Sequence, residues 1–164
     1  MSTVTDPEHA LSREDIETFL ALEAHLLDTR AYDEWLALWA PTLRYFVPGG
    51  PDTDEHPTVA LIDDDRAILE DRVFRMKHPA SHALDPPGKA VRLVGNAVIE
   101  RAEGPAIEVR SAYLLVVNRQ GIQTVYAARQ LHRLIERDGR FAIVLKHVDL
   151  TCSEDAIRNL TFLP

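Results

Sequence analysis

The sequence has few of the residues on which most catalytic and metal-binding motifs depend. Its 164 residues include one cysteine, Cys152, and only seven glycines. A single cysteine excludes an intrachain disulfide bond and a thiolate cluster for zinc or for iron and sulfur. The sequence also contains no Gly-x-Gly-x-x-Gly, phosphate-binding loop or Gly-x-Ser-x-Gly motif, so nucleotide-binding and serine-hydrolase classes lose their main support.

Clusters of basic residues and long apolar runs are absent as well. The net charge is −8, and Lys and Arg gather nowhere, which argues against nucleic acid and anionic membranes as partners because both would be repelled. No apolar stretch approaches the length of a membrane span. Residues 1–7 are polar and acidic, unlike a signal peptide, so we expect a cytoplasmic protein.

The composition predicts one globular domain. A hydrophobic fraction of 46% with 27% charged residues is ordinary for a globular chain of this length. We therefore expect a single domain over residues 1–164, with residues 1–11 as a flexible N-terminal segment.

The first half of the chain has a helical pattern. Ser12, followed three residues later by Asp15, predicts a helix start, and the apolar positions that follow lie on one face together with Glu23. A second short helix is predicted through Tyr32–Trp39, ended by Pro41, and a first strand is predicted to end at Pro48. The acidic run Asp63–Asp65 predicts the start of a third helix, with a cation site as the less favoured alternative.

The second half alternates between apolar and polar residues, as strands do. The predicted strands are Val91–Glu100, Ile107–Val117, Ile122–Ile135 and Phe141–Leu150. Turn residues separate them at hairpin spacing, so neighbours in sequence should pair antiparallel. Because long strands twist and curl, we expect an α+β fold in which a strongly curved, mostly antiparallel sheet forms a cone around the N-terminal helices.

Glu23 is the first candidate functional residue, because a carboxylate on an apolar helix face needs a partner or a proton. One interpretation is a structural ion pair with an arginine of the sheet, Arg110 or Arg129. The other is a general acid or base that lines a cavity. Trp35 and Trp39 are predicted to belong to the core.

The histidines give weaker candidates. His78 and His82 have the spacing of a helical metal site, but Pro79 follows His78 directly and disfavours a helix there, so a loop is predicted. His147 and Asp149 share one face of the last strand and could form a carboxylate-oriented base, although a hydrogen-bonded histidine beside the sheet is the favoured interpretation.

Short segments over most of the chain resemble one family. They include Glu23-Ala-His-Leu-Leu-Asp28 with Trp35-Leu36, then Arg44-Tyr45 with Pro48, Ile62-Asp63-Asp64-Asp65, Asp85-Pro86-Pro87 with Arg92-Leu93-Val94-Gly95-Asn96, Glu108-Val109-Arg110-Ser111, Tyr126-Ala127-Ala128-Arg129 and Asn159-Leu160-Thr161-Phe162-Leu163. In this order they resemble the small (beta) subunits of aromatic-ring-hydroxylating dioxygenases, from about residue 12 onward.

The resemblance implies a structural role in aromatic compound catabolism. It implies the cystatin-like cone of the ketosteroid-isomerase and nuclear-transport-factor superfamily, and assembly with a large (alpha) subunit, often as three large and three small chains. The Rieske iron–sulfur cluster and the mononuclear iron would belong to the large subunit. No cofactor or metal is expected in this chain, since one cysteine cannot supply a Rieske centre. Glu23, Trp35, Trp39, Arg110 and Arg129 would then be structural.

Two alternatives use the same cone. A stand-alone dehydratase or isomerase would employ Glu23, Tyr45, His82 or His147, although Val47 stands where isomerases of the superfamily keep a carboxylate base, and valine cannot abstract a proton. A small-ligand-binding protein without chemistry would need only an apolar cavity.

Overall fold

The computed structural model describes residues 12–50, 59–78, 88–103, 105–152 and 162–164. In chain order its elements are α1 (Arg13–Asp28), α2 (Tyr32–Leu36), β1 (Trp39–Val47), β2 (Ile62–Asp64), α3 (Arg66–Lys77), β3 (Lys89–Glu103), β4 (Ala106–Arg119), β5 (Ile122–Arg137) and β6 (Arg140–Leu150). Residues 1–11, His82 and most of the loop after Gly50 lie outside the described residues.

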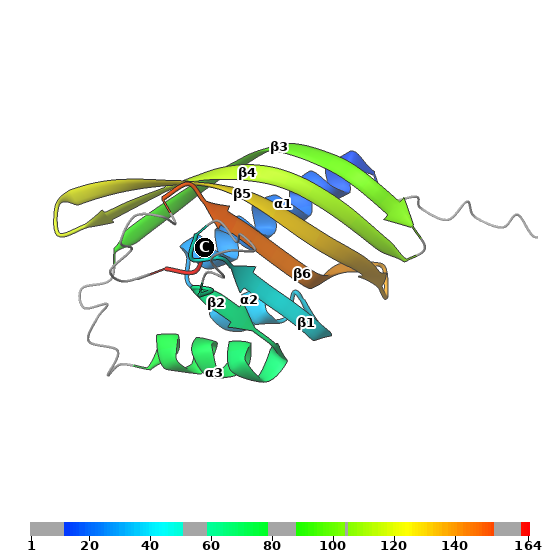
Figure 1. Ribbon diagram of the computed structural model, residues 1–164, viewed down its shortest axis with the longest axis horizontal. Coiled ribbons are helices and arrows are strands. Elements are labelled where there is room, and N and C mark those ends of the chain that lie inside the picture. The colour runs from blue at the N-terminus through cyan, green and yellow to red at the C-terminus, as the bar shows by residue number, and fades with distance from the viewer. Residues whose placement is uncertain (1–11, 51–58, 79–87, 104, 153–161) are drawn as a thin grey trace, which may run out of the picture.

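One curved sheet of six strands dominates the fold (Figure 1). The strand order is β2-β1-β6-β5-β4-β3, with β1 and β6 parallel and every other neighbouring pair antiparallel. The long strands β3, β4 and β5 arch over α1, while α2 and α3 lie near β1 and β2 (Figure 1). The predicted α+β fold, a curved mixed sheet around the N-terminal helices, is confirmed.

Helix α1 begins with the predicted cap. The Asp15 backbone N–H donates to the Ser12 hydroxyl at 3.2 Å, and the Ser12 backbone N–H donates to the Asp15 carboxylate at 2.8 Å. This reciprocal capping box satisfies two N–H groups that a helix start otherwise leaves without partners. The buried face of the helix includes the predicted apolar positions and Glu23.

The second helix is shorter than predicted, and Trp39 does not belong to it. Helix α2 ends at Leu36, and Trp39 and Pro41 lie in β1. The Ile143 N–H donates to the Leu38 carbonyl at 2.9 Å, so after Leu36 hydrogen bonds to β6 take the place of continued helical hydrogen bonds. The β1–β6 register shifts between Trp39 and Arg44, which accommodates a proline that has no N–H to donate.

The three aspartates before α3 have different structural roles. Asp65 is the N-cap, accepting the Ile68 N–H at 3.0 Å, whereas the two preceding aspartates belong to β2. Arg44 binds Asp63 at 2.8 Å and Arg72 binds Asp64 at 2.5 Å. The predicted start of the third helix is confirmed at Asp65, the last aspartate of the run, and the helix itself begins at Arg66. Among the described residues, no group of three or more His, Cys, Asp or Glu side chains could hold a metal ion.

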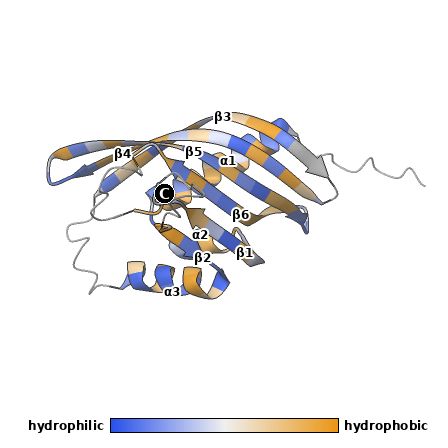
Figure 2. Ribbon diagram, viewed as in Figure 1, coloured by the Kyte–Doolittle hydropathy of each residue, from blue (hydrophilic) through white to orange (hydrophobic). Residues whose placement is uncertain are grey.

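The four predicted long strands are confirmed, each slightly longer than predicted. Their hairpins turn through residues with positive φ, Gln120 and Gly121 in one and Asp138 and Gly139 in the other. Hydrophobic and hydrophilic residues alternate along the strands, as Figure 2 shows. One face of the sheet therefore meets the helices and the other faces outward.

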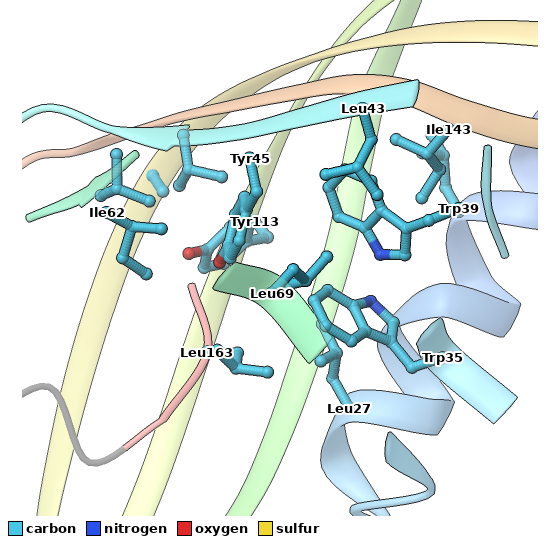
Figure 3. Close-up of a cluster of buried hydrophobic side chains, with 14 of the residues drawn as sticks. Leu27, Trp35, Trp39, Leu43, Tyr45, Ile62, Leu69, Tyr113, Ile143 and Leu163 are labelled. Carbon is cyan, nitrogen blue, oxygen red and sulfur yellow. The ribbon is translucent and has the colours of Figure 1, made fainter. Parts of the chain in front are cut away.

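The interior is filled by side chains. Trp35, Trp39 and Tyr45 form an aromatic cluster in which Trp35 stands edge-on to both partners, with ring centroids 5.4 and 6.0 Å away (Figure 3). Their burial confirms that both tryptophans belong to the core. In the parts of the chain that the structure describes, no helix is long and apolar enough to cross a membrane.

Candidate functional site

Three neighbouring strands place polar side chains in one row on the inner face of the sheet. Tyr45 of β1 pairs with Lys146 of β6, and Lys146 pairs with His132 of β5. Helix α1 lays Glu23 over this row, because Glu23 belongs to the buried face of the helix. The fold thus brings together four polar residues that are widely separated in sequence.

Glu23 is the centre of a buried ionic cluster. Its Oε1 accepts a hydrogen bond from Lys146 Nζ at 2.9 Å and another from the Trp35 indole N–H at 3.2 Å. Its Oε2 lies 2.9 Å from His132 Nε2. The side chains of Glu23, His132 and Lys146 are at most 3% exposed. We name Glu23, Trp35, His132 and Lys146 the inner cluster.

The charges of the inner cluster balance one another. Burial by itself would raise the pKa of Glu23, but electrostatic attraction and hydrogen bonds from Lys146 and His132 outweigh it and hold that pKa well below its usual value. Burial lowers the pKa of Lys146, and the Glu23 carboxylate opposes this effect. Since an ionised carboxylate has no proton to donate, we assign the hydrogen of the His132–Glu23 bond to Nε2.

Arg110 and Arg129 are not the partners of Glu23, so that part of the sequence prediction is wrong. Both arginines are exposed, and Arg110 binds Glu100 at 2.5 Å instead. They alternate with the buried neighbours Val109 and Ala128, and so point away from the interior. Glu23 does pair with a basic residue of the sheet, but that residue is Lys146.

His132 and Lys146 are the residues that sequence reasoning missed. His132 has the same strand phase as Gln130 and Leu134, which are both buried, and Lys146 has the same phase as the buried Val148. A histidine and a lysine at inward positions of alternating strands are the signal that could have revealed them.

Tyr45 and His147 make no hydrogen bond to Glu23. Tyr45 is buried, and its hydroxyl donates to the main-chain oxygen of Pro164. Burial raises the pKa of Tyr45 well above its usual value, so the hydroxyl keeps its proton. His147 packs edge-on against Phe46, with ring centroids 5.2 Å apart, and its Nε2 lies 3.6 Å from Asp149.

His147 and Asp149 therefore share a face, as predicted. That face is the outer one, because the alternating neighbours Lys146 and Val148 are buried. A substrate inside the cone would not meet this pair.

The inner cluster is closed to substrates. A hollow of about 500 Å³ between α1 and β3 is lined by other residues, among them His25, Asp28 and Arg92. Glu23 itself is 3% exposed, and its two oxygens already meet three donors. The geometry suits an internal ionic support for the fold better than a general acid or base, which must reach a reacting group.

Comparison with known proteins decides the family. Residues 22–155 match the family model described as the ring hydroxylating beta subunit, well over half of the chain. The chain belongs to this family. The structure of the beta subunit of benzoate 1,2-dioxygenase from Burkholderia mallei superposes with a TM-score of 0.80 at 27% identity, over 94% of this chain and 99% of that one.

Two further comparisons agree with this family and fold. This chain is 34% identical over 142 residues to the small oxygenase component of the p-cumate 2,3-dioxygenase system of Pseudomonas putida, covering 83% of this chain and 77% of the relative. A nuclear-transport-factor-like protein with a cystatin-like fold from Novosphingobium aromaticivorans superposes with a TM-score of 0.56 at 19% identity, over 89% of this chain and 86% of that one, which bears on the fold alone. The resemblance seen in the sequence is confirmed.

Proposed function

We propose that this beta subunit supports the assembly of an iron-containing large subunit in an aromatic-ring-hydroxylating dioxygenase, and that it performs no bond-making chemistry. The closed inner cluster carries the proposal, because its ionisable groups bind one another and are at most 3% exposed. On this proposal the Rieske cluster and the mononuclear iron reside in the large subunit, the chain itself holds no cofactor, and the complex is cytoplasmic.

Binding to the large subunit can be tested by producing the two chains together. When the two chains are produced together, the beta subunit should elute with the large subunit from a size-exclusion column, since a supporting subunit acts by binding. The matched sample is the beta subunit produced alone, which should show no turnover of an arene. Separate elution of the two chains, or turnover by the beta subunit alone, would contradict the proposal.

The outer face of the sheet offers a surface for a second copy of this chain. Two rows of paired residues cross the strands there, Val91–Val116–Val125 and Leu93–Leu114–Ala127. We name these six residues the outer stripe. Val91, Leu93, Leu114 and Val125 are between 48 and 69% exposed, and contiguous exposed apolar surface of this kind marks interaction sites.

Charge favours another copy as the occupant. The outer stripe holds no carboxylate and is bordered by Lys89 in the row beyond Val91 and by Arg129 in the row beyond Leu93. A chain with a net charge of −8 repels its copies except where apolar or cationic surface meets acidic surface. We therefore propose that three beta subunits associate as a homotrimer within a hetero-hexamer and cover the outer stripe.

Replacing Leu114 with aspartate should prevent this self-association, because it places a carboxylate in the middle of the outer stripe. Leu114 is 48% exposed, so the fold of the single chain should survive. Analytical ultracentrifugation should show a monomer for Leu114→Asp. The control is Phe74→Asp on α3, which alters a side chain that is 66% exposed and lies outside the stripe. A trimer that persists in Leu114→Asp, or a wild-type chain that is monomeric, would contradict the proposed interface.

A further inference from the structure

The last residues of the sequence lie inside the cone. Phe162 is 9% exposed, Leu163 is 3% exposed, and Pro164 is buried as well. In Figure 1 this segment ends near the centre of the molecule, against the concave side of the sheet. Figure 3 shows Leu163 in the same buried cluster as Tyr45 and Tyr113. We name Phe162–Pro164 the closing segment.

The closing segment is held as a bound peptide would be. The Tyr45 hydroxyl donates to the main-chain oxygen of Pro164, and Arg92 Nη2 donates to the main-chain oxygen of Leu163. The ring of Phe162 packs on that of Tyr126, with centroids 4.6 Å apart. Two backbone acceptors and one aromatic side chain therefore find partners on β1, β3 and β5.

The strand register builds the receiving surface from one part of the inner face. Arg92 and Tyr126 lie on either side of Leu115, in a single row across β3, β4 and β5. Tyr113 follows in the next inner row. Asp28 fixes the arginine from helix α1, since its carboxylate lies 2.5 Å from Arg92 Nη1 and accepts the Arg92 backbone N–H at 2.6 Å.

This surface presents more donors than the closing segment uses. The Tyr113 hydroxyl and Arg92 Nε are buried, and neither has a hydrogen-bond partner among the described residues. The side chain of Arg92 is 4% exposed and Tyr113 is 3% exposed, so bulk water has little access to these donors. Unsatisfied donors in such a place fit a ligand with acceptor oxygens.

We propose that this part of the inner face is a binding site for a short apolar peptide that presents two main-chain oxygens, and that the closing segment occupies it as an internal ligand. Arg92 and Tyr45 bind the two main-chain oxygens, and Tyr126 packs against the apolar body. The site lies on the inner face of the sheet, opposite the outer stripe, so the proposal does not depend on subunit assembly.

A chain that ends at residue 161 tests the proposal, with the peptide acetyl-Phe-Leu-Pro amide as the probe. Isothermal titration calorimetry should detect binding to the shortened chain and binding at least ten-fold weaker to the full chain, whose own segment competes. The control peptide acetyl-Asp-Leu-Pro amide should not bind, because a charged side chain replaces the ring that packs on Tyr126. A shortened chain that is folded by circular dichroism and ignores the probe, or equal binding by both chains, would overturn the proposal.

A second measurement uses the full chain, so it decides the question even if the shortened chain does not fold. Tyr45→Phe removes a hydroxyl that binds the closing segment, whereas Tyr32→Phe removes a hydroxyl on α2, outside the receiving surface. Hydrogen exchange of the Leu163 amide, followed by NMR, should become about five-fold faster in Tyr45→Phe, the effect of one lost hydrogen bond on a local opening. It should stay unchanged in Tyr32→Phe. Equal exchange rates in the two variants would refute the internal-ligand model.

Discussion

Replacing Glu23 with glutamine is expected to lower the free energy of unfolding by about 3 kcal/mol. The amide is nearly the same size as the carboxylate but carries no charge, so Lys146 keeps its ammonium group 2% exposed without a counter-charge. His132 and Trp35 also exchange a charged acceptor for a neutral one, which weakens their hydrogen bonds. Urea denaturation followed by tryptophan fluorescence measures the difference.

Two comparisons separate the lost charge from a general surface effect. Glu17→Gln removes an exposed carboxylate whose side chain is 51% exposed and bound to Arg13, so it should cost less than about 0.5 kcal/mol. The double variant Glu23→Gln/Lys146→Met removes both buried charges and should be more stable than Glu23→Gln alone. The interpretation of the inner cluster fails if Glu23→Gln costs no more than Glu17→Gln.

The pH dependence follows from the lowered pKa of Glu23. Its pKa in the folded chain lies below the ordinary value of 4.5, so the ionised form stabilises the fold above that pH and the contribution is lost as the pH falls below it. The stability difference between the wild type and Glu23→Gln should therefore have its full size at neutral pH and shrink in acid.

In an assembled dioxygenase, Glu23→Gln should keep its turnover per complex. A selective loss of turnover with normal assembly would favour a catalytic Glu23.

Replacing Trp35 with alanine is expected to cost about 4 kcal/mol, the range for a large aromatic side chain removed from a core. Trp35 is 0% exposed and packs edge-on against Trp39 and Tyr45. Its indole N–H also binds Glu23 at 3.2 Å, so the substitution opens a cavity and weakens the inner cluster at once. Thermal and urea unfolding of the single chain measure the loss.

The polar share of this effect can be isolated with the neighbouring tryptophan. Trp35→Phe and Trp39→Phe remove similar apolar surface, but only Trp35 donates to Glu23, since Trp39 Nε1 has no hydrogen-bond partner among the described residues. Trp35→Phe should therefore be less stable than Trp39→Phe by about 1 kcal/mol. Equal losses would mean that the indole bond to Glu23 contributes nothing measurable.

Local secondary structure was predictable wherever the sequence pattern that specifies it lies within a few residues. The Ser12–Asp15 capping box and the positive φ angles at Gly121 and Gly139 each follow from their immediate neighbours. The same is true of the alternation that marks the four long strands. Prediction failed where a distant strand intervened, as at Trp39, which β6 draws into the sheet although its own neighbours favour a helix.

The sequence by itself determined the order of the three helices, the first strand and the four long strands, together with the family resemblance, because periodicity, capping and turn residues act over short distances. It did not predict the short strand β2, whose partner β1 lies outside its local sequence. It also determined that Glu23 needs a partner, since a buried carboxylate cannot stay charged alone. Only the tertiary structure decided that this partner is the pair of Lys146 and His132, and that Phe162–Pro164 lie buried against the inner face of the sheet. Those contacts depend on which strands become neighbours and in what register, and that is set by packing of the whole sheet around α1.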